Sequence, residues 1–550
     1  MSLCNRRQQS LWTIDKIVKS PHKDIDIPRR TINDHIWENL EKWADKTALV
    51  CGITNRSYTY NQLYKYSRNF AARLRTHLKI KEGDVVCIMM SNSPEYAVVA
   101  LGALEAGAVV TTVNPIYTPH EVQRQIELSD PTLLIGQTET ISCLKEALFL
   151  VKKNLPIITV KGSESTIPSG TISFEELALG DNVDHSVLKE VSRSFEDIAF
   201  LPYSSGTTGL PKGVELPHKQ MVVNCLQQDV NTIRQYDETT STNQDVTLNI
   251  LPLYHIYGLT VILLHKLSIG SKIVTVPKFQ PNTFINVLKE HPINMLYAAP
   301  PLILFLSSHP GVTEEHLASV KVIASGAAPL PTSDVIKLLE KTKPAVNFVN
   351  LYGMTECSPL VTAMSLGSNN YSTVGHAVSN TELRIADSEL KPLGVNEVGE
   401  LLIRGPQVMK GYRNNPEATK DAIINDGWYR SGDLGSIDKD GVVTITDRLK
   451  ELIKVKGYQV PPAELEHILK EHPDVLDVAI VGVPHSRIGE YPKAFIVLKE
   501  GRKADVDGIT SFVNKQVAEY KRVKEVMFLD ALPRNPSGKI LRRILKEKYC

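Results

Sequence analysis

Residues 203–214 read YSSGTTGLPKGV and directly follow the apolar run at 198–202. The stretch holds two serines, two threonines, three glycines and a lysine. Glycines let the backbone approach an anion closely, so that successive backbone N–H groups form a concave nest, and hydroxyl groups and a lysine add further donors. The composition therefore predicts a loop that binds a polyphosphate. A flexible surface loop is the alternative interpretation.

This loop differs from two common nucleotide-binding loops. The P-loop has four residues between its glycines and ends in Gly-Lys-Ser/Thr. Here Gly206 and Gly209 are three positions apart, and Gly213 follows Lys212. The dinucleotide pattern Gly-x-Gly-x-x-Gly is also absent from the stretch. The sequence therefore indicates a phosphate-binding loop of another type.

The bulk composition is that of an ordinary globular protein. A length of 550 residues predicts three or four structural units at about 150 residues each. Hydrophobic residues make up 42% and charged residues 22%. The net charge of +1 gives no support to nucleic-acid binding. The seven cysteines are scattered without Cys-x-x-Cys spacing, which predicts reduced thiols in an intracellular compartment and no structural zinc.

The two ends of the chain bear on localisation. Residues 1–30 lack the apolar core of a secretory signal, but hold seven basic residues against three aspartates. A mitochondrial presequence and an ordinary polar leader both fit this composition. The chain ends Lys548-Tyr549-Cys550, which does not match the peroxisomal Ser-Lys-Leu signal. We therefore expect a cytoplasmic or mitochondrial protein rather than a peroxisomal one.

Two long uncharged apolar runs, 246–265 and 291–313, resemble membrane spans at first sight. Proline, histidine and glycine interrupt the first run, and Pro300-Pro301 divides the second. A membrane span needs about 20 predominantly apolar residues. We therefore expect both runs to lie in the protein core and no segment to span a membrane. Peripheral contact with a membrane surface is compatible with the sequence.

Strand and helix patterns alternate through most of the chain. Residues 85–90 read as a buried strand, 94–108 as a helix and 109–113 as the next strand. A further strand is expected at 321–324. This alternation predicts strand–helix–strand units and a mainly parallel sheet.

The C-terminal hundred residues have a different pattern. Helices are expected at 463–471 and 506–520, and strands at 475–483 and 494–498. This order predicts a compact α+β unit of about 100 residues. The natural boundary lies near 447–450.

Six further segments hold side chains suited to a nucleotide or an acid. Taken alone, each segment also has a structural interpretation. In chain order these are a core histidine, a strand-to-helix turn, a tight turn with an exposed glutamate, surface charges, a charged hairpin and a solvated lysine. The segments are LPLYHIYG at 251–258, SGAAPL at 325–330, YGMTE at 352–356, YRSGD at 429–433, DRLKELIKVKG at 447–457 and NPSGK at 535–539.

Taken together and in this order, the seven stretches resemble the adenylate-forming superfamily, which includes acyl-CoA synthetases, plant 4-coumarate–CoA ligases and beetle luciferases. The resemblance runs from about residue 30 to 545. It implies an α/β fold with a large N-terminal domain of stacked, mainly parallel sheets, helices and a small barrel-like part, and a small mobile α+β C-terminal domain. The implied divisions are a leader at 1–28, possibly targeting or disordered, an adenylation domain at 29–447, a hinge at 448–450 and a C-terminal domain at 451–550.

The resemblance also implies roles for individual residues. Asp433 would accept both ribose hydroxyls, with Arg448 on the same ribose, and Glu356 would hold Mg²⁺, because a carboxylate near ATP is otherwise repelled. The implied ATP/AMP-binding set is Ser204, Ser205, Gly206, Thr207, Thr208, Gly209, Lys212, Ala327, Asn350, Tyr352, Gly353, Thr355, Asp433, Arg448, Lys450, Gln459 and Lys539.

Further implied roles concern the acid, CoA and catalysis. The acyl substrate would contact His255, Tyr257, Gly326 and Leu351, and CoA would contact Lys278, Lys456 and Gly457. Lys539 would bridge the α-phosphate and the attacking carboxylate, because neutralising charge in a dry site is the main catalytic effect. The implied catalytic residues are Lys539, Lys454, His255, Thr355 and Glu356.

The resemblance implies an ATP-dependent acyl-CoA ligase that uses Mg²⁺ and CoA. One departure bears on the substrate: Asn350-Leu351 stands where plant coumarate ligases usually have Gln-Gly. A leucine there would narrow the acyl pocket, so we expect a medium- or long-chain fatty acid. The alternatives are a 4-coumarate-type aromatic acid, a luciferase-like monooxygenase, and a non-catalytic nucleotide-binding protein.

Overall fold

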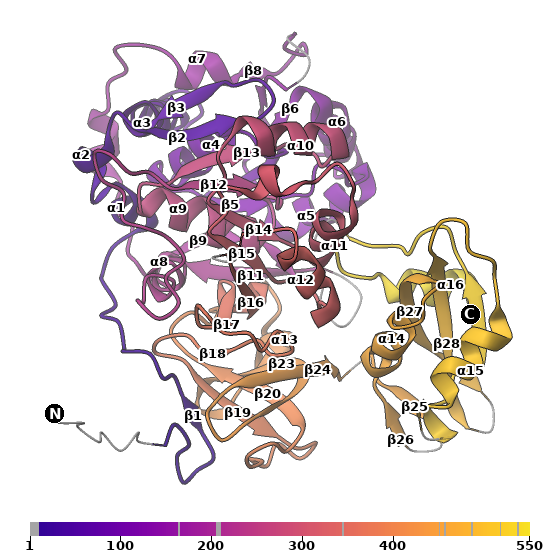
Figure 1. Ribbon diagram of the computed structural model, residues 1–550. Helices are drawn as coiled ribbons and strands as arrows, with labels where there is room; N and C mark the ends of the chain where they lie inside the picture. Colours follow the sequence, from indigo (N-terminus) through magenta and orange to yellow (C-terminus); the bar gives the residue numbers. More distant parts are fainter. Residues whose placement is uncertain are drawn as a thin grey trace.

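The computed structural model describes residues 10–162, 166–204, 211–343, 346–449, 451–455, 458–485, 488–517, 519–535 and 538–550, without the side chains of Tyr458 and Gln459. A large N-terminal part stands beside a smaller C-terminal part, drawn in orange and yellow in Figure 1. The sequence-based expectation of an α/β fold with a small α+β unit is confirmed.

Two stacked sheets build the large part. In each sheet a parallel centre is flanked by antiparallel pairs at one end or both. The first follows the order β10 (Tyr203–Ser204), β11 (Lys212–Pro217), β9 (Ile198–Leu201), β5 (Val109–Thr112), β4 (Val85–Met89), β6 (Leu133–Gln137), β7 (Ile157–Val160) and β8 (Ile172–Ser173), with β21 (Gly411–Tyr412) beside β11. The second follows β18 (His376–Ala377), β17 (Leu360–Ala363), β16 (Asn347–Gly353), β15 (Val322–Ser325), β14 (Met295–Ala298), β12 (Val246–Asn249), β13 (Lys272–Thr275), β2 (Thr47–Cys51) and β3 (Ser57–Thr59).

Helices fill the space between the sheets and cover their outer faces (Figure 1). Helix α4 is apolar on nearly all sides, begins with a proline in its first turn, and contacts β5 of one sheet and β2 of the other. A helix that is apolar all round belongs in a core. The helices of this part are α1 (Ile32–Trp37), α2 (Leu40–Trp43), α3 (Tyr60–Thr76), α4 (Pro94–Glu105), α5 (Pro119–Ser129), α6 (Ile141–Leu150), α7 (Phe174–Ala178), α8 (His218–Gln227), the π-helix η3 (Tyr257–Leu264), α9 (His265–Ser268), α10 (Pro281–Glu290), α11 (Pro300–Ser308) and α12 (Thr332–Leu339).

A smaller antiparallel sheet completes the N-terminal part. It consists of β1 (Val18–Lys19), β19 (Glu382–Ala386), β20 (Gly399–Arg404), β23 (Trp428–Ile437), β22 (Ile423–Ile424) and β24 (Val443–Arg448), with α13 (Pro416–Ala422) beside it. The N-terminal residues lie along this sheet: β1 pairs with β19, and the Trp12 indole donates to the carbonyl of Asp438 at 2.8 Å. Residues 10–28 are therefore part of the folded N-terminal region.

The C-terminal part has its own sheet and its own core. Strands β26 (Tyr458–Val460), β25 (Ile453–Val455), β28 (Gly489–Leu498), β27 (Val475–His485) and β29 (Glu525–Phe528) carry α14 (Pro462–Lys470), α15 (Val506–Asn514) and α16 (Arg542–Tyr549). Helix α15 ends earlier than the 506–520 pattern predicts. The amide of Asn514 bonds the backbone N–H and C=O of Val523, which anchors the chain at the helix end.

The predicted elements 85–90, 94–108, 109–113 and 321–324 match β4, α4, β5 and β15 within a few residues. The two apolar runs, 246–265 and 291–313, contain β12, η3, β14 and α11, all in hydrophobic clusters. Both are core segments, as expected. Among the described residues, none of the helices has the length and apolar character needed to span a membrane.

Candidate active site

A cavity of about 2090 Å³ opens where the N-terminal and C-terminal parts face each other. Its walls include residues at or just after the carboxyl ends of β5, β12, β15 and β16, the usual ligand site of open α/β sheets. Residues of β23, β24 and the segment 534–547 contribute the opposite side. Chain segments more than 400 positions apart thus share one cavity.

Asp433, which is buried, and Arg448, which is partly exposed, form an ion pair within this cavity. The two residues are direct partners in the antiparallel pair β23–β24, and Arg448 Nε lies 3.2 Å from Asp433 Oδ1. The Tyr352 hydroxyl donates to Asp433 Oδ2 at 2.7 Å. Burial raises the pKa of Asp433, and Arg448 and Tyr352 oppose that effect. An ionised carboxylate has about four acceptor positions, so this one has room for a diol.

Glu356 lies a short distance along the same wall. It belongs to the 3₁₀ turn Thr355–Cys357 that follows β16, and its Oε1 accepts a hydrogen bond from the Tyr412 hydroxyl at 2.9 Å. The Lys212 ammonium stands 4.9 Å from the centre of the Tyr412 ring. A carboxylate and a cation on one cavity wall suit a metal-bound polyphosphate.

A magnesium ion fits this donor set. Mg²⁺ is usually held by one or two carboxylates together with substrate phosphates. The described residues contain no group of three or more His, Cys, Asp or Glu side chains that could bind a metal alone. Glu356 is buried but lines the cavity, so its carboxylate could contribute to such a shared site.

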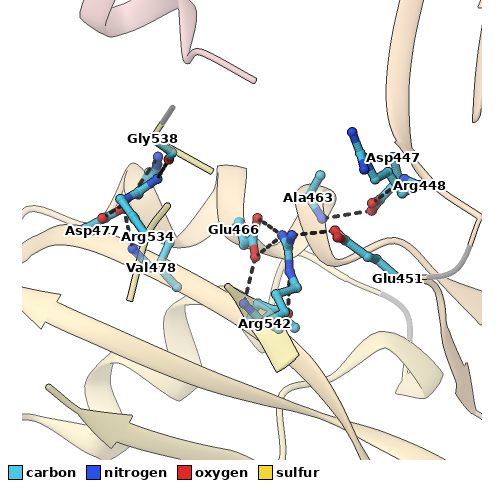
Figure 2. A network of polar contacts seen from close by, with 12 residues as sticks. Asp447, Arg448, Glu451, Ala463, Glu466, Asp477, Val478, Arg534, Gly538 and Arg542 are labelled. Atoms are coloured by element: carbon cyan, nitrogen blue, oxygen red, sulfur yellow. Dashed lines mark hydrogen bonds and ion pairs between the residues drawn. The ribbon is translucent and has the colours of Figure 1, made fainter. Parts of the chain in front are cut away.

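Lys539 enters the cavity from the C-terminal part. Its backbone N–H donates to Asn535 Oδ1 at 2.8 Å. Just before it, the Gly538 carbonyl accepts from Arg534 at 2.6 Å (Figure 2). Burial, together with the nearby Arg448 and against the opposing effect of Glu451 and Asp433, lowers the pKa of Lys539 to about 8. Lys539 is therefore a cation placed near the Asp433–Arg448 pair.

Gly538, the residue before Lys539, packs against Pro301 of the N-terminal part. Its φ is +84°, and a Cβ atom there would come within 2.7 Å of Pro301. Side chains rarely adopt this conformation, and the contact leaves no space for one. Pro536 and Ser537 of the same predicted motif lie outside the described residues.

A network of ion pairs stabilises the region behind Lys539. The Arg542 guanidinium bonds both oxygens of Glu466, at 2.7 and 2.8 Å, and also pairs with Glu451 (Figure 2). The Asp447 carboxylate accepts from the Ala463 N–H at 3.0 Å. These contacts join α16, α14 and the end of β24. They therefore hold in place the elements next to the segment that carries Lys539.

The predicted acyl residues gather in a second zone of the cavity. The Tyr257 N–H donates to His255 Nδ1 at 3.2 Å, and burial lowers the pKa of His255 to about 4. A Cβ atom at Gly326 would lie 3.0 Å from the Leu351 carbonyl and 3.3 Å from the Tyr257 ring. His255, Tyr257, Gly326 and Leu351 all line the cavity, and His255 is neutral at physiological pH.

The remaining predicted nucleotide residues lie at varied positions. Ser204, Ala327, Tyr352, Gly353 and Thr355 line the cavity. Asn350 is not among the described lining residues: its amide donates to the carbonyls of Tyr371 and Thr373, at 2.8 and 3.0 Å. Outside the described residues are Ser205, Gly206, Thr207, Thr208, Gly209, Lys450, Lys456 and Gly457, together with the side chain of Gln459.

Two predicted lysines lie away from the cavity. Lys454 is exposed on β25, and its backbone N–H donates to Glu490 at 2.9 Å. Lys278 is exposed in the segment between β13 and α10. Neither is among the residues that line the cavity as described, so Lys539 and Lys454 occupy different environments.

Sequence reasoning missed several lining residues. Tyr412, which bonds Glu356, lies in a two-residue strand without a hydrophobic pattern. Thr112 ends β5, Asn114 follows it, and Tyr254 follows β12. The rule that ligands bind at the carboxyl ends of parallel strands could have identified these three positions.

Comparison with known proteins agrees with this architecture. Residues 36–413 match the AMP-binding enzyme family, and residues 464–539 match the AMP-binding enzyme C-terminal domain. The chain is 40% identical over 543 residues to 4-coumarate–CoA ligase 3 of Oryza sativa subsp. japonica, which covers 97% of this chain and 95% of that protein. It is 38% identical to 4-coumarate–CoA ligase 1 of Arabidopsis thaliana, over 98% of this chain and 96% of that one.

A solved structure with the same architecture is ATP-bound MatB from Rhodopseudomonas palustris. It has a TM-score of 0.83 and 28% identity, over 94% of this chain and 99% of that one. The family match covers more than half of the chain, and the relatives match it almost end to end. The chain therefore belongs to the AMP-binding enzymes of the adenylate-forming superfamily and is an AMP-forming acid–CoA ligase.

Proposed function

We propose that this ligase activates an aromatic acid of the 4-coumarate type. The acid would first form an acyl-adenylate with release of pyrophosphate, and its acyl group would then pass to CoA with release of AMP. Relatives named 4-coumarate–CoA ligases, 38–40% identical over nearly the whole chain, support an aromatic acid better than the fatty acid expected from Leu351. The observation that carries the reaction is Lys539 in one cavity with Asp433 and His255.

The nucleotide would lie along the wall formed by β16, β23 and β24. Asp433 would accept the ribose hydroxyls while Arg448 and Tyr352 hold its carboxylate in place. Ser204 and Lys212, which pair across β10 and β11 at the base of the predicted phosphate loop, would direct that loop to the phosphates. Glu356 would bind Mg²⁺, which would neutralise phosphate charge.

The first chemical step needs little proton transfer. A carboxylic acid with a pKa near ~4 is already ionised at neutral pH, so no general base is required. The carboxylate oxygen would attack the α-phosphorus, and the bond from that phosphorus to the pyrophosphate oxygen would break. Lys539 would neutralise both anions as they approach, and neutral His255 would border the carboxylate without adding charge.

The second step requires another arrangement of the same parts. We propose a rotation of residues 451–550 relative to 29–447 about the hinge 448–450, which would withdraw Lys539 and bring exposed Lys454 to the cavity. Gln459 would act in this step, and CoA would approach along Lys456-Gly457 and Lys278. Its thiolate would attack the acyl carbon, and AMP would leave with the electron pair of the broken bond.

A fatty acid is the second candidate substrate. Leu351 is 7% exposed, lines the cavity and lies next to Gly326, which also adjoins the Tyr257 ring. Its side chain therefore narrows the acyl zone. Replacing Leu351 with glycine should increase activity toward aromatic acids relative to aliphatic ones. If the variant ranks the acids as the parent enzyme does, Leu351 does not determine which acid is used.

Pyrophosphate release tests the proposal directly. Purified protein would receive Mg·ATP, CoA and one of four acids: 4-coumarate, cinnamate, octanoate or palmitate. We expect the highest kcat/KM with an aromatic acid, together with the matching acyl-CoA. Preference for octanoate or palmitate would support the fatty-acid candidate, and light emission with added luciferin would support the monooxygenase alternative.

A further inference from the structure

Lys266 is the most unusual buried side chain outside the site described above. It belongs to α9, directly after the π-helix that begins at Tyr257, and it is 0% exposed. Its ammonium group has no hydrogen-bond partner among the described residues. Buried lysines are rare unless they are paired, because desolvation of the charge is costly. Such a group requires a functional or structural explanation.

The neighbouring acidic groups do not supply that partner. Asp229 Oδ1 already accepts from His265 at 2.8 Å and from the Tyr236 hydroxyl at 2.6 Å. Asp245 is paired with Lys321 at 3.0 Å. Both carboxylates influence Lys266 only through space, and burial lowers the pKa of Lys266 to about 7. Its amine therefore carries less charge than a surface lysine.

Aromatic rings surround the amine. Its nitrogen lies 5.2 Å from the centres of both the Tyr236 and the Tyr297 rings. Contacts of this kind stabilise a cation, but they leave its N–H donors unused. The Tyr297 ring packs edge-to-face on Tyr257 at 6.4 Å, and the Tyr257 hydroxyl also lacks a hydrogen-bond partner among the described residues. Two polar groups without hydrogen-bond partners in the described chain, the Tyr257 hydroxyl and the Lys266 amine, thus lie in or next to the acyl zone.

A small second cavity lies between Lys266 and two leucines that also line the acyl zone. It measures about 10 Å³, close to the volume of one water-sized probe. Lys266, Gln228 and Gln235 line its polar side. Leu351 and Leu360 line its other side, and the same two leucines line the large cavity. The leucines are therefore the partition between the acyl zone and the unpaired amine.

We propose that Lys266 recognises a neutral oxygen, a hydroxyl or a carbonyl, at the end of the acyl substrate farthest from its carboxylate. This inference rests on the proposed acid–CoA ligase activity. A lysine offers only donors while protonated, and an oxygen acceptor would satisfy them. A change of the Leu351 or Leu360 rotamer would join the two cavities around such a substrate. An acid without that oxygen would leave the amine unpaired.

The test compares matched acids that differ by one oxygen. Pyrophosphate release would be measured with 4-coumarate against cinnamate, and with 8-hydroxyoctanoate against octanoate. Sites that hydrogen-bond a substrate hydroxyl discriminate strongly against the analogue without it, so we expect a preference of at least about tenfold for the oxygenated acid. Lys266→Met should reduce that ratio to about one and leave the hydrocarbon acid's kcat/KM unchanged or higher.

Lys493, a second buried lysine among the described residues, provides a matched control. Lys493 is 7% exposed in the C-terminal part and donates to the Tyr549 carbonyl at 2.8 Å. Lys493→Met should leave the selectivity ratio as in the parent protein. A Lys266→Met variant that loses activity equally with both members of a pair, or keeps the parent ratio, would overturn the proposal.

Thermal unfolding separates this inference from the proposed ligase activity. An unpaired buried amine lowers stability, so Lys266→Met should keep or raise the melting temperature. A fall of more than about 5 °C would identify Lys266 as a structural residue held by its aromatic neighbours and overturn the inference. If no acid is turned over by the parent protein, the proposed function fails, while this stability measurement still decides whether Lys266 is structural.

Discussion

The position of Lys539 predicts an unusual pH dependence for adenylate formation. A free lysine titrates near ~10.4 and stays charged throughout the neutral range. Burial beside Arg448 lowers the pKa of Lys539 to about 8. Its charged form is the one that would neutralise phosphate and carboxylate, so activity should fall as the pH rises through that value.

The size of the effect follows from the titration. With a pKa near 8, about 91% of Lys539 is charged at pH 7 and about 9% at pH 9, an expected loss of about tenfold. The quantity to measure is kcat/KM for ATP in the pyrophosphate-release assay, because this ratio reports pKa values of the free enzyme. Bound phosphates would raise the pKa, so the fall in kcat should come at higher pH.

An arginine at this position provides the control. Arginine remains charged to above pH 12, so Lys539→Arg should show lower activity but no loss between pH 7 and 9. Lys539→Met should lower adenylate formation at every pH. If the parent enzyme keeps a constant kcat/KM to pH 10, or if Lys539→Arg retains the same fall near pH 8, another group controls the profile and the reasoning is wrong.

Three further substitutions test other parts of the site. Asp433→Asn should raise the Kd for ATP by about tenfold to a hundredfold, because charged hydrogen bonds to ribose and Arg448 are lost, and isothermal titration with ATP would check this. Arg542→Met should lower the free energy of unfolding by about 3 kcal/mol in urea denaturation, and addition of Glu466→Gln should recover part of that loss. Gly538→Ala should slow adenylate formation at least about tenfold through its positive φ, while thiolysis of supplied acyl-adenylate by CoA stays unchanged.

Periodicity was enough to predict the framework around the site. The β4–α4–β5 unit was predictable because its strands are short and apolar and its helix is apolar throughout, which only a buried strand–helix–strand unit explains. Helix α15 was overestimated because the sequence pattern continues past Asn514. The bond from Asn514 to Val523 that accompanies its end is a tertiary contact that local pattern does not encode.

The site itself was only partly predictable. The family resemblance predicted Asp433 and Arg448, whose pairing depends on the short connection between two adjacent strands. It could not predict that Tyr412 bonds Glu356, because these residues are 56 positions apart and meet through different sheets. The sequence also could not predict that Lys266 lacks a hydrogen-bond partner among the described residues. This depends on the tertiary contacts of the two nearest carboxylates, because Asp229 is bonded to His265 and Asp245 to Lys321.

The contacts between the N-terminal and C-terminal parts suit a C-terminal part that changes position between the two steps of the proposed reaction. The hydrophobic clusters of residues 453–549 are separate from those of the large part, so each has its own core in the described chain. Contact between them relies on local features, such as Gly538 against Pro301 and the Asp447 bond to Ala463. An interface of this kind can be broken without opening either core. With the rotation proposed above, Lys539 would line the cavity during the first chemical step and leave it for the second, so the position of the C-terminal part would be coupled to the chemistry.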